Sequence, residues 1–72
     1  MNRPHTLDVR WLEPPEPFER IVAALETLPE EDQLRVMIHR EPQPLFRWLE
    51  RENYRFHHHY NPEGYFEIFI SR

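Results

Sequence analysis

The turn sequence Asn-Pro-Glu-Gly at residues 61–64 restricts this chain more than any other feature. Asn at the first position, Pro at the second and Gly at the fourth favour a type I turn that ends in a left-handed residue and closes a three-residue hairpin loop with a bulge. The flanking segments 54–60 and 65–70 have the alternating pattern of strands. Asn61 then lies opposite Tyr65, and the apolar residues of both strands fall on one face. The opposed pairs on that face are Tyr60 with Phe66, His58 with Ile68 and Phe56 with Ile70.

The preceding sequence predicts two more strands and two helices, in alternation. Residues 6–10 and 34–39 alternate apolar and polar side chains, and residues 18–28 carry an apolar stripe at helical spacing. A second helix is expected to start at the prolines of residues 42–44 and to end at Asn53, which tolerates a left-handed backbone. The expected inward-facing helix residues are Phe18, Ile21, Val22, Leu25, Leu28, Leu45, Trp48 and Leu49. These elements predict an α+β fold, a two-layer α/β sandwich of order β-α-β-α-β-β with two helices on one face of a four-stranded mixed sheet.

Length and composition limit the core and the classes of partner. The chain has 72 residues and no cysteine, so we expect a single domain over residues 1–72 without disulfides. A chain of this length buries only about 60% of its unfolded surface, which makes the core thin. The net charge is −4 and the arginines are scattered among acids, which argues against nucleic-acid binding. No apolar run is long enough for a signal peptide or a membrane span, so we expect a cytoplasmic protein with no membrane partner.

A proline-rich stretch, residues 10–18 (RWLEPPEPF), precedes the first predicted helix. Proline suits a helix start, because its φ is already helical and its missing N–H would have no partner within the helix. A helix N-terminus that follows a strand often binds anions through free N–H groups. Here three prolines remove such donors, and Glu13, Glu16 and Glu19 add negative charge. We therefore expect phosphate and nucleotide pyrophosphate to bind poorly at this helix start.

The same turn carries a family resemblance. LDVRWLEPPEP, an amphipathic helix, LRVMIHREPQP and a terminal hairpin together resemble the TusA/SirA-like family of small sulfur carriers. They resemble still more closely an uncharacterised bacterial group of the same fold that lacks the carriers' cysteine. In the carriers the turn reads Gly-Leu-x-Cys-Pro-x-Pro, and its cysteine carries a persulfide at the helix N-terminus. Here Trp11 stands for the glycine, Leu12, Pro15 and Pro17 match, and Pro14 takes the cysteine position. The resemblance implies the carriers' fold without persulfide transfer, which needs a thiolate.

Residues 57–59 are three consecutive histidines. On a strand, His57 and His59 project from one face, and the predicted register places His59 opposite Glu67. Two histidines and a carboxylate suit zinc or non-haem iron, so one hypothesis is a metal- or haem-binding site formed by these three residues. The alternative is an ordinary solvated sheet face, because an opposed His/Glu pair contributes only about 0.2–1 kcal/mol and nothing in the sequence supplies buried groups to orient the rings.

The sheet face away from the helices is expected to carry Met37, Phe69 and Tyr65, while Trp11 is expected to project from its turn. Aromatic residues and methionine are enriched at protein interfaces, so these four residues are candidates for contact with a protein partner or a second copy of the chain. Isolated exposed apolar residues also occur without any function. Both interpretations remain open at this point.

Catalytic constellations are not recognisable in the sequence. The only serine, Ser71, lies at the end of the chain, and the glutamates near the first helix lie beside no predicted cleft. We therefore expect neither enzymatic activity nor a cofactor. The leading interpretation is a non-catalytic protein-interaction module, and the alternative is a metal- or haem-binding module. A sulfur relay would need a thiol that the chain lacks.

Overall fold

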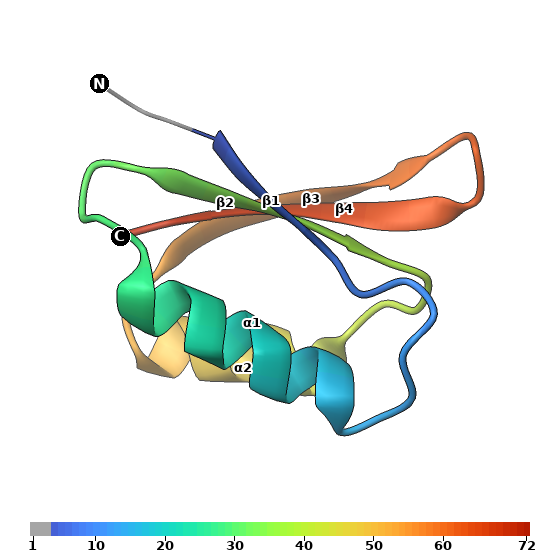
Figure 1. Cartoon of the computed structure of the whole chain (residues 1–72), viewed down its shortest axis with the longest axis horizontal. Coiled ribbons are helices and arrows are strands. Elements are labelled where there is room, and N and C mark those ends of the chain that lie inside the picture. The colour runs from blue at the N-terminus through green and yellow to red at the C-terminus, as the bar shows by residue number, and fades with distance from the viewer. Residues whose placement is uncertain (1–3) are drawn as a thin grey trace.

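The computed structural model describes residues 4–72, which form six elements in two layers (Figure 1). In chain order the elements are β1 (Pro4–Asp8), α1 (Glu16–Thr27), β2 (Gln33–Ile38), α2 (Gln43–Arg51), β3 (Arg55–Asn61) and β4 (Tyr65–Ser71). Both helices lie against the same face of the sheet, which confirms the predicted element order and two-layer arrangement. Within residues 4–72, neither helix has the length and apolar character needed to cross a bilayer.

The sheet has the strand order β1-β2-β4-β3. β1 and β2 are parallel, whereas β4 lies between β2 and β3 and is antiparallel to both. The observed register of the hairpin is the predicted one, with Asn61 opposite Tyr65 and His58 opposite Ile68. β1 and β3 are therefore the two edge strands.

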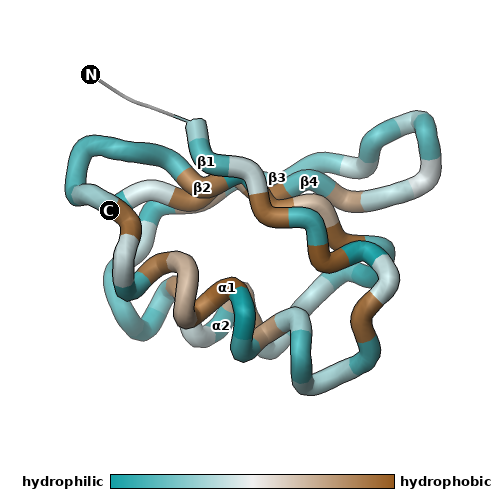
Figure 2. The backbone as a smooth tube through the Cα atoms, in the orientation of Figure 1, coloured by the Kyte–Doolittle hydropathy of each residue, from teal (hydrophilic) through white to brown (hydrophobic). Residues whose placement is uncertain are grey.

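The core lies between the helices and the sheet. β2 alternates buried and half-buried residues, as predicted for a strand with one covered face, and apolar stretches occur in both layers (Figure 2). The buried apolar residues of this core are Val9, Ile21, Leu25, Leu28, Leu34, Val36, Ile38, Leu45, Phe46, Leu49, Ile68 and Ile70. Trp48, predicted to face inward, is only half buried at the core margin, where its ring stacks on Tyr54 at 5.7 Å and meets the edge of Phe18 at 6.0 Å.

Two left-handed residues shape the connections around the hairpin. Asn53, just after α2, has a φ of 64°, and Gly64 in the turn has a φ of 105°, as the sequence predicts for both positions. The Gly64 N–H donates to the Asn61 carbonyl oxygen at 2.9 Å, and the Asn61 side-chain oxygen accepts from the Glu63 N–H at 2.8 Å. These bonds satisfy the turn internally and hold the hairpin register.

β1 spans residues 4–8, so it begins and ends two residues earlier in the chain than the predicted strand 6–10. The Arg10 guanidinium and backbone N–H both donate to the Asp8 carboxylate, at 2.8–3.1 Å, and this local contact accompanies a turn away from the sheet. Val9 still extends the pairing by one bond, since its N–H donates to the Met37 carbonyl oxygen at 2.9 Å. Side-chain capture of this kind is not visible in an apolar/polar pattern.

We predict that Gly64→Ala destabilises the fold. An added Cβ has room, since its nearest neighbour is the Tyr60 hydroxyl oxygen at 3.9 Å, but a φ of 105° strains any side chain. The free energy of unfolding in urea should fall by about 1–3 kcal/mol. Asn53→Gly is the matched control, because glycine at that left-handed position should leave stability unchanged or raise it. An alanine variant as stable as the wild type would contradict this account of the turn.

Candidate functional site

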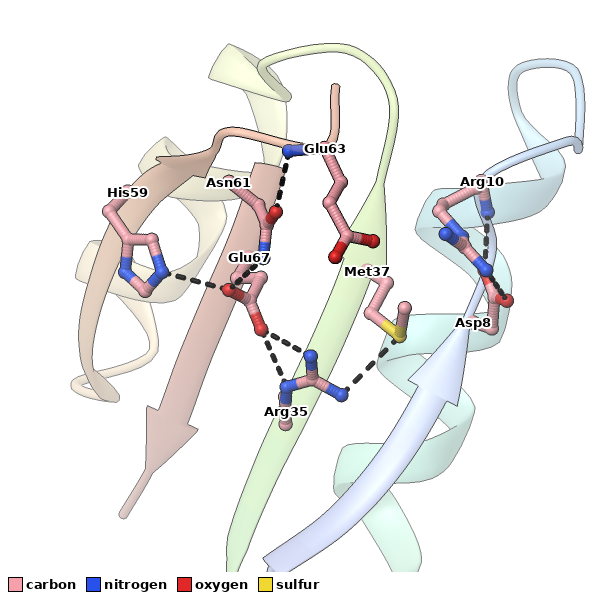
Figure 3. A network of polar contacts seen from close by, with 8 residues as sticks. All are labelled: Asp8, Arg10, Arg35, Met37, His59, Asn61, Glu63 and Glu67. Carbon is pink, nitrogen blue, oxygen red and sulfur yellow. Dashed lines mark hydrogen bonds and ion pairs between the residues drawn. The ribbon is translucent and has the colours of Figure 1, made fainter. Parts of the chain in front are cut away.

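A cluster of polar side chains centred on Glu67 occupies the sheet face that the helices leave open (Figure 3). Glu67 Oε1 accepts hydrogen bonds from His59 Nε2 at 2.8 Å and from Asn61 Nδ2 at 3.1 Å. Glu67 Oε2 accepts a hydrogen bond from Arg35 Nε at 2.7 Å and forms an ion pair with the same guanidinium. Arg35 Nη1 also lies 3.4 Å from the Met37 sulfur. The carboxylate thus links β4 to both neighbouring strands.

The environment of Glu67 favours its ionised form. The residue is only 6% exposed, and burial by itself raises the pKa of a carboxyl group. Hydrogen bonds from Asn61, Arg35 and His59, together with the positive charge of Arg35, outweigh this effect and lower the pKa of Glu67 to about 2. A carboxylate with this pKa is a poor general base at neutral pH, and both of its oxygens already have partners. Glu67 therefore serves to hold the sheet together.

The structure brings the three proposed metal ligands together only in part. His59 binds Glu67, but the His57 ring stacks on Phe69 at 5.0 Å between centroids, and His59 also contacts Phe69 at 5.8 Å. Within the described part of the chain, no three His, Cys, Asp or Glu side chains lie close enough to share a metal ion. The geometry adds no support to the metal- or haem-binding hypothesis, which stays a prediction from the sequence.

The open face also differs from the apolar contact surface that the sequence suggests. Tyr65 is buried, with 8% exposure, and the Arg10 guanidinium lies 4.8 Å from the centre of its ring. Phe69 is half buried against the two histidine rings, and Met37 is half buried beside Arg35. A partner at this face would meet mainly imidazole and guanidinium groups. A partner-binding role for Met37, Phe69 and Tyr65 remains a prediction.

Trp11 is the predicted contact residue that projects most freely. It lies in the turn after β1, its side chain is 82% exposed, and its ring stacks on His39, just after β2, at 6.1 Å. Tyr60, at 57%, is the other large exposed apolar side chain within residues 4–72. Since His39 also lines a pocket, Trp11 marks the rim of a second candidate site.

This second site is an apolar pocket of about 360 Å³ between the start of α1 and the start of α2. It lies beyond the C-terminal ends of the parallel strands β1 and β2, each of which leads into one of the two helices. Ile21, Ile38 and Leu45 connect it to the buried core. The other lining residues are Leu12, Pro14, Pro15, Pro17, Phe18, His39, Arg40, Glu41, Pro42 and Pro44.

Prolines make the helix starts that line this pocket poor in hydrogen-bond donors. Pro15 and Pro42 precede the first residues of α1 and α2, and Pro17 and Pro44 are the second residues of these helices. Because proline has no N–H, these helix starts offer fewer donors than the usual anion-binding helix N-terminus. A pocket of this kind suits an apolar group and not a phosphate.

The surroundings of the pocket are acidic. A shallow hollow next to it shares two of the prolines and is bordered by Glu13, Glu16, Glu19 and Arg20. Arg20 is paired with Glu16 at 2.9 Å. Together with Arg40 and Glu41, the two hollows carry four glutamates and two arginines, so the pocket lies in a locally negative part of the surface.

Sequence reasoning missed the pocket and the role of Arg35. A usable signal was present, because each proline pair follows a strand, and the C-terminal ends of parallel strands meet at one edge of a sheet. The two proline-rich helix starts must therefore lie side by side. Arg35 lies opposite Phe69 in the register and reaches Glu67 diagonally. The strand register by itself does not predict which diagonal neighbour a long side chain will contact.

We predict that Glu67→Gln weakens the fold at neutral pH and much less in strong acid. An unfolded carboxyl titrates near 4.5, whereas the folded pKa is about 2, so its stabilising effect is complete above pH 4.5 and is lost as the pH falls toward 2. At pH 7 the variant should be about 1–3 kcal/mol less stable, because charged hydrogen bonds are lost. Thermal unfolding of both proteins across this pH range measures the difference between their stabilities. This difference should become smaller as the pH falls toward 2.

Glu63→Gln is the matched control, since Glu63 is an exposed acid in the adjoining turn. Its melting temperature should follow that of the wild type at every pH. A Glu67→Gln difference that stays constant down to pH 2 would show that the charge of Glu67 is not what stabilises the sheet.

A comparison with protein-family models matches this chain to one family. The model described as "Uncharacterized conserved protein (DUF2249)" matches residues 6–72, from β1 through β4. A search of curated proteins and a search of solved structures both found no match. The match spans both helices, the pocket between their starts and the Glu67 cluster. The chain therefore belongs to the DUF2249 family of uncharacterized conserved proteins.

Proposed function

We propose that this domain is a non-catalytic binding module whose proline-walled pocket, beside Trp11, captures an apolar side chain from a basic segment of a partner protein. The observation that carries the proposal is the position of a donor-poor apolar pocket next to the most exposed large aromatic side chain of residues 4–72. We further infer that the domain keeps the scaffold of the TusA/SirA-like sulfur carriers, in their cysteine-less bacterial branch, because its turn sequence matches theirs except at Trp11 and Pro14.

The size and rim of the pocket support capture of a single large side chain. Its volume of about 360 Å³ lies at the lower end of the range for small-ligand pockets. Tryptophan is one of the residues that most often dominate binding energy at interfaces, since it buries a large area at a small cost in conformational entropy. Trp11 would fold over the captured side chain from the rim, where it now stacks only on His39.

Charge favours a basic partner segment. The pocket and the neighbouring hollow carry four glutamates against two arginines, and the whole chain has a net charge of −4. Complementary charges steer association and fix orientation more than they add affinity. We therefore infer an apolar anchor side chain flanked by arginine or lysine in the partner.

The residues near the pocket support a role without catalysis. Pro14 stands where the resembling carriers have their reactive cysteine, so this turn offers no nucleophilic sulfur. His39, Arg40 and Glu41 are exposed and therefore not shielded from water as catalytic groups usually are. An inert pocket is consistent with a binding role.

We predict that a short synthetic peptide with a central tryptophan between arginines binds in the pocket. In a methyl NMR titration, saturable chemical-shift changes should appear at Ile21, Ile38 and Leu45, which line the pocket. They should not appear at Ile68, a core residue of β4 outside the pocket lining. Trp11→Ala should weaken binding by roughly tenfold or more, as expected for removal of a central aromatic contact. Circular dichroism of the variant verifies that it still folds.

Tyr60→Ala is the matched control, because Tyr60 is the other large exposed apolar residue within residues 4–72 and lies on β3, away from the pocket. This variant should bind the peptide as the wild type does. A peptide with glutamates in place of the arginines should bind more weakly, and one with a central alanine should not bind measurably. The proposal fails if no saturable shift reaches the pocket floor, or if the alanine peptide binds equally well.

A further inference from the structure

The histidine strand β3 is a free edge of the sheet. It is seven residues long and pairs with β4 along its whole length without a bulge. Edge strands are commonly protected from pairing with other chains by lysine, proline, bulges or repeated charges. Residues 55–61 contain none of these features, and Arg55 is their only charge, apart from the three histidines. The other edge strand, β1, is shorter and begins at Pro4, which has no N–H to donate.

The hairpin register determines which backbone N–H and C=O groups of β3 do not bond to β4. The Gly64 N–H donates to the Asn61 carbonyl oxygen, and Asn61 lies opposite Tyr65, so this pair closes the hairpin. Bonded and non-bonded pairs alternate along an antiparallel ladder. The N–H and C=O groups of Phe56, His58 and Tyr60 are accordingly directed away from β4, toward the outer edge.

We propose that a second copy of this chain pairs with β3, antiparallel and with a two-fold axis at His58, to form a continuous eight-stranded sheet. His58 then faces His58 of the second copy, and Phe56 faces its Tyr60. These are the three residues whose backbone groups point outward, so every hydrogen bond of the new ladder has a donor and an acceptor. The arrangement is self-complementary, as a two-fold interface requires.

Side chains at this edge support a copy of the same chain as the occupant. Tyr60 is 57% exposed and contacts Phe66 at 5.0 Å, so pairing with Phe56 of the second copy would cover an exposed aromatic ring. Cross-strand aromatic pairs stabilise antiparallel sheets. Arg55 of each copy would lie opposite Asn61 of the other, next to the exposed acid Glu63. At both ends of the interface, a positive charge of one copy would therefore lie near a negative charge of the other.

The helical layer reaches this edge of the sheet. Both helices lie on one face of the sheet (Figure 1), and Phe46 of α2 stacks on Phe56 and His58 of β3, at 5.3 and 4.4 Å between ring centroids. A two-fold axis perpendicular to the sheet at His58 would therefore bring the two copies of α2 next to each other on the same face.

The test measures self-association and amide protection in the full chain. Sedimentation equilibrium at neutral pH should show a reversible monomer–dimer equilibrium. Amide hydrogen exchange of the wild type should slow with rising protein concentration at Phe56, His58 and Tyr60, whose N–H groups the monomer leaves unpaired. His58→Lys should weaken dimerisation by about tenfold or more, because two like charges then lie directly opposite each other.

Thr6→Lys, on the exposed edge strand β1, is the matched control and should dimerise as the wild type does. The proposal is overturned if the wild type sediments as a monomer at the highest attainable concentration, or if His58→Lys is folded and dimerises normally. Concentration-independent exchange at the three outward amides would overturn it as well, and this readout needs no variant. The outcome is independent of peptide capture at the pocket, which lies at a different part of the sheet.

Discussion

The register of β4 is the constraint on which the other parts of this structure depend. β4 lies between β2 and β3, and its residues alternate between Ile68 and Ile70 in the core and Glu67 and Phe69 on the open face. Shifting the strand by one residue would place a carboxylate among the helices and remove two isoleucines from a thin core. The turn at Gly64 prevents that shift, and it simultaneously decides which groups of β3 face the free edge.

The parts of the fold that sequence reasoning predicted are those set by local chemistry. Alternation identified the strands, the turn residues gave the β3–β4 register, and the positive φ values occur at the expected Asn53 and Gly64. The failures involve long side chains that reach beyond their immediate partners. Arg10 binds Asp8 where β1 ends, two residues before its predicted end, and it also lies over Tyr65, a residue that alternation alone would place at the surface.

The candidate site shows the same division between local and spatial information. The exposure of Trp11 agrees with its position in a turn, and His59 does contact Glu67 as the register indicated. The pocket could not be placed from periodicity, because its walls come from two helix starts that are far apart in sequence and adjacent only once β1 and β2 are parallel. The register places His57 opposite Phe69, and the stacking of its ring on that residue is a detail that the sequence pattern does not show.

The side chains of the open face contact one another. Arg35, His59 and Asn61 contact both oxygens of Glu67, and the rings of His57 and His59 stack on Phe69. The two proposals therefore place binding elsewhere, at the pocket between the helix starts and at the outer edge of β3.

Proline rings at the two helix starts have a further consequence for affinity. Each ring locks its own φ, and therefore the pocket walls have few alternative conformations to lose when a ligand binds. Ordering of flexible groups is a major cost of association, so a rigid pocket can achieve useful affinity with a small contact area. The same rigidity makes the pocket selective for shape, because its walls cannot adjust to a ligand of different shape.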